Sequence, residues 1–240
     1  MSAGRLERVL RLSGEFVVIV VGVLMALAVD QWAAKASDRE TEVEYLEALL
    51  RDLDAEAEFF ADATGPLRLL ALADSALQEV GPVARGTAAF PVDTVRFLRQ
   101  VITSRRTVAV ASTGSPTFEE LVSTGSLRLI RSAELRSNLI AYYSLATNIE
   151  ARGLERSSGY APLVRSLLPD DPLQGDDVSE TRIRSYGVER AARAVREPDF
   201  VEALNRHAAY IQFLLPSFEQ LRAELDALRN RVRSELLQSR

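Results

Sequence analysis

An all-α fold, in which a single N-terminal transmembrane helix precedes a helical bundle, is predicted by three features of the sequence. Residues 16–29 form an apolar run without a charged side chain. Beyond it, apolar residues recur at spacings of three and four, as the buried face of a helix requires. Gly-Pro pairs separate these segments, and only residues 107–111 resemble a strand, which alone has no pairing partner.

The first helix is expected to be a membrane anchor over residues 15–36. A bilayer core of about 30 Å takes about 20 helical residues, whereas the run from Phe16 to Val29 spans about 21 Å. Small and apolar flanking residues complete the length, and Trp32 is placed as an aromatic of the membrane interface. Residues 1–14 then form a cytoplasmic tail, and residues 37–240 form a helical extracytoplasmic domain.

The charges that flank the run predict its orientation. Arg5, Arg8 and Arg11 precede it, so the positive-inside rule places the N-terminus in the cytoplasm. In a bacterial inner membrane the domain over residues 37–240 then lies in the periplasm. The alternative is a cleaved signal peptide, because the same arginines make a basic leader and Ala26-Leu27-Ala28 fits a cleavage site.

Small residues form a stripe along one face of the predicted anchor. At 100° per residue, Glu15, Gly22, Ala26 and Ala33 fall within about 40° of one another. Small residues four apart let two helices approach closely, so this stripe is a candidate docking face for another transmembrane helix. The alternative is a chance pattern in a segment rich in Ala and Val.

An acidic helix is expected to continue from the anchor to about Ala63. It holds ten Asp or Glu and two Arg between Asp38 and Asp62. These carboxylates lie along a rod and do not converge as a calcium site requires, so a solvated face partly paired with arginines is the preferred interpretation. Its predicted apolar seam has heptad spacing and comprises Val43, Leu46, Leu50, Leu53, Ala57 and Phe60.

Further helices are expected over residues 67–80, 92–106, 117–124, 132–168, 188–195 and 199–238. Thr117 to Glu120 has capping-box spacing, Gly125 is placed as a C-cap, and Ser132 is placed as an N-cap. Heptad spacing continues through the last helix. We therefore predict long coiled-coil-like helices, with the acidic helix and the last helix forming a stalk.

The composition argues against several kinds of site. The chain has no cysteine, and His207 is its sole histidine, so neither a thiolate nor a histidine cluster can hold a metal. Residues 38–240 hold 31 acidic and 25 basic side chains, which disfavours nucleic acid as a partner. We therefore expect a protein that is not an enzyme and has no catalytic, cofactor-binding or metal site.

Two stretches resemble an uncharacterised bacterial family, a domain of unknown function. The first runs from Gly14-Glu15 through Gly22 and Ala26-Leu27 to Trp32 and continues to Leu53. The second runs from Thr117-Phe118 through Gly125 to Ile130 and Tyr142-Tyr143. The resemblance implies one N-terminal anchor and a helical extracytoplasmic domain, and it implies no activity. The chain departs from the family pattern in its scarcity of Lys and in the break at Gly65-Pro66.

Taken together, these features predict an accessory or scaffolding subunit of a larger membrane protein complex, such as a respiratory or photosynthetic assembly. The expected partners are the lipid bilayer and another transmembrane helix. The alternative is a ligand-sensing periplasmic bundle that signals through a partner, since a tail of about 15 residues is too short for an output domain.

Overall fold

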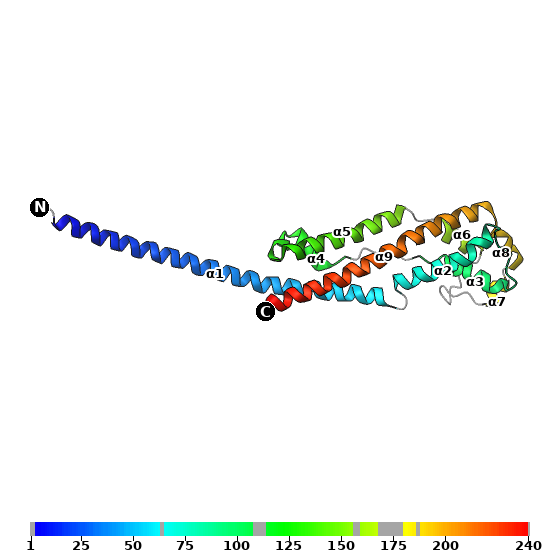
Figure 1. The fold of residues 1–240 in the computed structure, drawn as a ribbon, viewed down its shortest axis with the longest axis horizontal. Helices are drawn as coiled ribbons and strands as arrows, with labels where there is room; N and C mark the ends of the chain where they lie inside the picture. The colour runs from blue at the N-terminus through cyan, green and yellow to red at the C-terminus, as the bar shows by residue number, and fades with distance from the viewer. Residues whose placement is uncertain are drawn as a thin grey trace.

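The computed structural model describes the backbone of residues 3–62, 65–107, 114–155, 159–167, 180–185 and 188–239. Side chains are described in these ranges except at 3–20, 154–155, 180, 182, 185 and 188. Throughout these ranges the regular structure is helical, which confirms the all-α prediction (Figure 1). The elements are α1 (Ala3–Ala61), α2 (Pro66–Ala84), α3 (Thr94–Ser104), α4 (Pro116–Ser123), η1 (Ser126–Leu129), α5 (Ala133–Glu155), α6 (Tyr160–Leu167), α7 (Glu180–Ser185), α8 (Val188–Ala194) and α9 (Pro198–Ser239).

Helix α1 is one continuous helix that belongs to the bundle only along its second half. Its first half projects alone from the end of the bundle (Figure 1). The predicted division between residues 36 and 37 therefore lies inside a helix, because no Gly or Pro interrupts the hydrogen-bond ladder there. Among the residues that the structure describes, no helix is both long enough and apolar enough to cross a membrane.

Helix α9 is the central element of the bundle. It runs antiparallel to the second half of α1 and also packs against α2, α5 and α6 (Figure 1). Its buried side chains keep the predicted heptad spacing, and the predicted pairing of α1 with α9 is confirmed. From the middle of the helix to its end these residues are Ile211, Leu214, Phe218, Leu221, Leu225, Leu228 and Val232.

The seam predicted for α1 is only partly correct. Leu46, Leu53 and Phe60 are buried as expected, but Leu50 is only half-buried. Leu49, which the heptad pattern left out, is fully buried. The buried face is wider than a two-helix seam because α1 packs against α4 and η1 as well as against α9.

The helix ends agree with the glycine and proline signals in some places and not in others. Gly65-Pro66 ends α1 and starts α2, as predicted. Helix α2 continues through Gly81-Pro82, where an end was predicted, and stops at Ala84. Pro82 lacks the N–H that would donate to the carbonyl of Gln78, and the helix ends two residues beyond it. The single helix predicted over residues 132–168 is divided into α5 and α6, and residues 108–111 lie outside the described part of the chain.

Candidate functional site

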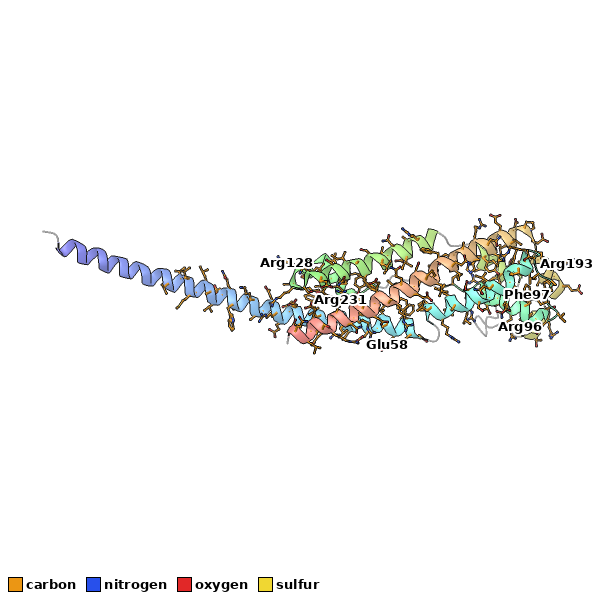
Figure 2. All side chains as sticks on the ribbon, viewed as in Figure 1. Glu58, Arg96, Phe97, Arg128, Arg193 and Arg231 are labelled. Atoms are coloured by element: carbon orange, nitrogen blue, oxygen red, sulfur yellow. The ribbon has the colours of Figure 1, made fainter. Side chains whose placement is uncertain are left out.

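The exposed segment, residues 21–40 of α1, has the most unusual surface of the molecule. Every one of its side chains is exposed, although residues 21–29 are all apolar or glycine. Leu24 is 60% exposed, Met25 67% and Trp32 73%. In Figure 2, side chains of this part of α1 project both above and below the ribbon. Residues 21–29 are thus apolar on every side of the helix, and no described residue of the bundle covers them.

The predicted docking stripe is open along its described length. Gly22, Ala26 and Ala33 are exposed, and a Cβ atom added to Gly22 would meet no atom within 4 Å. Glu15 lies among the side chains that the structure does not describe. The stripe is thus free to receive another helix, although its partner stays a prediction.

A set of polar contacts, which we call the joint, fixes the base of the exposed segment to the bundle. The joint is formed by four parts of the chain: residues 42–56 of α1, helix α4, the turn η1, and residues 130–143, which include the turn before α5 and its first half. At its edge lies Glu42, which is only 5% exposed. One carboxylate oxygen of Glu42 accepts the backbone N–H of Arg131 at 2.5 Å, and the other lies 3.3 Å from the Nε of the same arginine.

The centre of the joint is the carboxylate of Asp52, which receives the N-terminus of α4. Its Oδ2 accepts the hydroxyl of Ser115 at 2.6 Å and the backbone N–H of Thr117 at 3.1 Å. Ser115 in turn accepts the N–H of Phe118 at 3.0 Å, as an N-cap does. The N–H groups in the first turn of a helix have no acceptor within the helix, and the helix dipole is positive at this end. Both stabilise the negative charge of Asp52 at this position.

The same contacts correct one sequence prediction and confirm two others. The N-cap of α4 is Ser115 and not Thr117, because Pro116 is compatible with the first helical turn and the helix begins there. Gly125 follows α4 with φ of 71°, so the predicted left-handed C-cap is present. Ser132 accepts the N–H of Leu135 at 3.2 Å, which confirms it as the N-cap of α5.

Aromatic side chains complete the joint on the side of α5. Tyr45 of α1 donates its hydroxyl to Glu120 at 3.1 Å, and Tyr142 donates to Glu56. The rings of Phe118 and Tyr143 stack with centroids 4.2 Å apart. Burial raises the pKa of Tyr143, and the neighbouring carboxylates raise it further, so this hydroxyl stays neutral at ordinary pH.

The joint therefore brings together residues from two separate stretches of the sequence, residues 14–53 and residues 117–143. Tyr45 and Asp52 come from the first stretch, and Thr117, Phe118 and Glu120 come from the second. Sequence inspection identified both stretches, but it missed the role of Asp52 and Glu42. Each is one of ten similar carboxylates on α1, and no local signal distinguishes it from the others.

A second polar group, which we call the distal cluster, lies in the core near the far end of the bundle and consists of Ser104, Tyr160 and His207. The hydroxyls of Ser104 and Tyr160 lie 2.8 Å apart, and Ser104 donates to the carbonyl of Val101 at 2.8 Å. The Nε2 of His207 lies 2.9 Å from the carbonyl oxygen of Ser104, so it carries the proton in the neutral ring.

Burial decides the chemistry of the distal cluster. All three side chains are completely buried, and burial lowers the pKa of His207 to about 4. The hydrogen bond to Ser104 raises this pKa without offsetting the burial. The neutral imidazole stacks on Tyr160 with centroids 5.0 Å apart. Because no solvent reaches the cluster, it serves as a packed structural element, as predicted for this histidine.

Acidic residues of α1 pair with arginines of α9. Asp54 accepts hydrogen bonds from Arg229, at 2.8 Å to Nε, and from Arg233 at 2.9 Å. The hydrogen bond to Asp54 raises the pKa of Arg229. Within the described residues no group of His, Asp and Glu is arranged to hold a metal ion. The contacts of Asp54 with Arg229 and Arg233 show that some carboxylates of α1 pair with arginines of a neighbouring helix, as predicted.

A shallow hollow of about 290 Å³ lies between α5 and α9. Its lining includes polar groups of Asn138, Gln220, Glu224 and Arg231. The amide nitrogen of Asn138 is buried and has no hydrogen-bond partner among the described residues. The volume is at the lower limit of sites that hold small molecules.

Comparison with known proteins adds no further assignment. The chain matches no family model, and no curated protein or solved structure resembles it significantly.

Proposed function

We propose that this chain is a single-pass membrane protein that acts as an accessory or scaffolding subunit of a larger membrane complex. Its anchor comprises residues 15–36, its N-terminus lies in the cytoplasm, and residues 37–240 form an extracytoplasmic domain. The observation that carries the proposal is the exposed segment. Nine consecutive residues without a polar side chain, 21–29, stand clear of the bundle, and none of the described elements covers them.

The energetics of the exposed segment support a membrane environment. Val21, Val23, Leu24, Met25, Leu27 and Val29 are each between 45% and 67% exposed. Burying a side chain of this kind contributes roughly 1.5–3 kcal/mol. Six of them left in water would forgo on the order of 10 kcal/mol, which is comparable with the whole stability of a domain. Lipid or a partner helix removes this cost.

The joint supports a scaffolding role. Glu42 lies two residues and Asp52 twelve residues beyond the exposed segment. Glu42 binds Arg131 in the turn before α5, and Asp52 binds Ser115 at the start of α4. Because α1 is continuous through this region, the bundle cannot rotate freely about the anchor. A domain held in a fixed direction above a membrane can position partner proteins.

The docking stripe provides a direct test of this proposal. The double variant Gly22→Leu and Ala26→Leu places two bulky side chains on the stripe. It is expected to lose the complex, because close helix approach requires small residues. The measurement is extraction of native membranes in mild detergent, followed by native-gel separation and mass spectrometry of the band that contains this chain.

Ala28→Leu is the matched control. It makes an Ala-to-Leu change about 120° from Gly22 and about 160° from Ala26 around the helix, and so outside the stripe. The complex is expected to survive this change. If the wild-type chain migrates alone, or if the stripe variant migrates with the same complex as wild type, docking through the stripe is wrong. If the chain is washed from membranes by carbonate, the anchor itself is wrong.

The hollow between α5 and α9 favours a second candidate function, a ligand-sensing bundle. Asn138 offers an amide donor, and Arg231 on the facing helix, which is paired with Glu134, offers its remaining N–H groups. A small polar molecule retained by the purified chain in native mass spectrometry, and lost in Asn138→Leu, would support this candidate. A chain that migrates alone and retains no small molecule would count against it.

A further inference from the structure

A groove lies where the exposed segment meets the bundle. Its volume is about 610 Å³, and it is lined by Trp32, Lys35, Ala36, Asp38 and Arg39 of α1 and by Arg131 from the turn before α5. Trp32, Lys35 and Arg39 follow one another at spacings of three and four, so they share one face of α1. Figure 2 marks this end of the bundle by Arg128 of η1.

The groove carries a positive charge. It contains three cations and the single carboxylate of Asp38. Glu42 offsets the charge of Arg131, but among the described residues neither Lys35 nor Arg39 forms an ion pair. Both are exposed and are therefore available to an anion.

Arg131 holds the two walls of the groove together. Its backbone N–H and its Nε engage Glu42, while its Nη2 lies 3.4 Å from the carbonyl oxygen of Lys35. These contacts fix the turn before α5 beside α1, at the level of the free cations. The groove is thus a built feature of the fold, defined from both sides.

The groove also lies at a defined distance from the apolar run. Lys35 and Arg39 follow Val29 by about 9 Å and 15 Å along the helix. The polar headgroup layer of a bilayer occupies about 5–7 Å on each side of the hydrocarbon. If Trp32 marks the boundary of the hydrocarbon, Lys35 lies about 4.5 Å beyond it, within the headgroup layer. Arg39 lies about 10.5 Å beyond it, outside the layer, and its long side chain can reach back toward the phosphates.

We propose that this groove binds the phosphate of an anionic membrane lipid in the extracytoplasmic leaflet, an inference that rests on the proposed membrane location. Lys35 and Arg39 donate hydrogen bonds to the phosphate oxygens. Trp32 packs beside the upper part of the acyl chains. Asp38 opposes a second negative charge, so a singly charged phosphodiester fits the groove better than a dianionic phosphate.

The test is lipid retention by the full chain in mild detergent, measured by native mass spectrometry. The probe is an equal mixture of phosphatidylglycerol and phosphatidylcholine. The wild-type chain is expected to retain phosphatidylglycerol preferentially. In the double variant Lys35→Gln and Arg39→Gln this preference should fall by about 25-fold, since each cation near a membrane surface contributes a factor of about five.

The double variant Arg51→Gln and Arg99→Gln is the matched control. It removes two exposed cations outside the groove and should keep the preference of the wild type. Equal retention of both lipids by the wild-type chain, or an equal loss in both double variants, would overturn the inference. Competition by millimolar inorganic phosphate as strong as competition by the lipid would identify a soluble anion as the ligand and would also overturn it.

A separate arm distinguishes this inference from the proposed function. The wild-type chain is mixed with vesicles of phosphatidylcholine alone and is floated on a density gradient. Flotation without a preference for phosphatidylglycerol would leave the anchor intact and remove only the lipid site. Failure to float would remove the anchor, and with it the membrane setting that the lipid site requires.

Discussion

The joint and the distal cluster hold different parts of the same bundle with opposite chemistry. The joint uses two carboxylates that accept backbone N–H groups, the half-buried Asp52 and the buried Glu42. The distal cluster uses neutral groups that are completely buried, with His207, Ser104 and Tyr160 bonded to one another. The charged groups of the joint orient the turns around α4 and α5 on α1. The neutral groups of the distal cluster satisfy one another's hydrogen bonds, so they can be buried without water. The two should therefore respond differently to pH, mutation and salt.

The largest predicted effect is a loss of folding stability in acid, caused by protonation of His207 in the distal cluster. The pKa of His207 is about 4 in the folded chain and about 6.5 in an unfolded one, so between these values only the unfolded chain binds the proton. Its contribution is fully present above pH 6.5 and is lost as the pH falls toward 4. The free energy of unfolding should drop by roughly 3 kcal/mol across this window.

Denaturant unfolding at several pH values would measure this effect, with His207→Gln as the control. The amide of Gln can donate to the carbonyl of Ser104 but does not titrate. Tyr160 and Tyr210 do not contribute in this window, because burial raises the pKa of each hydroxyl. If wild type and variant show parallel pH profiles between pH 6.5 and 4, the buried neutral histidine is not the cause.

The largest effect at the joint should come from Asp52→Ala. The change removes the acceptor for the Ser115 hydroxyl and for the Thr117 N–H. Loss of such a cap costs about 1–2 kcal/mol. Hydrogen exchange should become faster in α4, and the distal cluster should be unaffected. Asp52→Asn, which keeps an acceptor oxygen, should recover part of the loss; equal exchange in α4 of wild type and Asp52→Ala would contradict this role.

A smaller effect is expected where α1 and α9 are joined by exposed ion pairs. Asp54→Ala removes the partner of Arg229 and Arg233, and Asp54 is about 40% exposed. Such pairs contribute about 0.5–1 kcal/mol and are screened by salt. The loss of stability should therefore shrink between 0.05 and about 1 M salt. A loss that is unchanged by salt would show that packing, and not charge, joins the two helices here.

The sequence by itself determined the helical class, most helix ends and the seam of α9. These features are local, because helix periodicity, the Gly65-Pro66 break and the positive φ of Gly125 depend on residues a few positions apart. It also marked the exposed segment, since nine consecutive apolar residues are visible without any fold.

Only the tertiary structure decided which polar residues matter. Asp52 meets Ser115 and Glu42 meets Arg131 across long stretches of chain, and the sequence does not rank them above their neighbours. The full burial of Leu49 has the same origin, because it depends on α4, η1 and α9 packing on α1 together. The burial of His207 likewise depends on tertiary packing, because Ser104 at the end of α3 and Tyr160 of α6 contact it. Pairing of distant segments follows from packing of the whole chain, which no local pattern records.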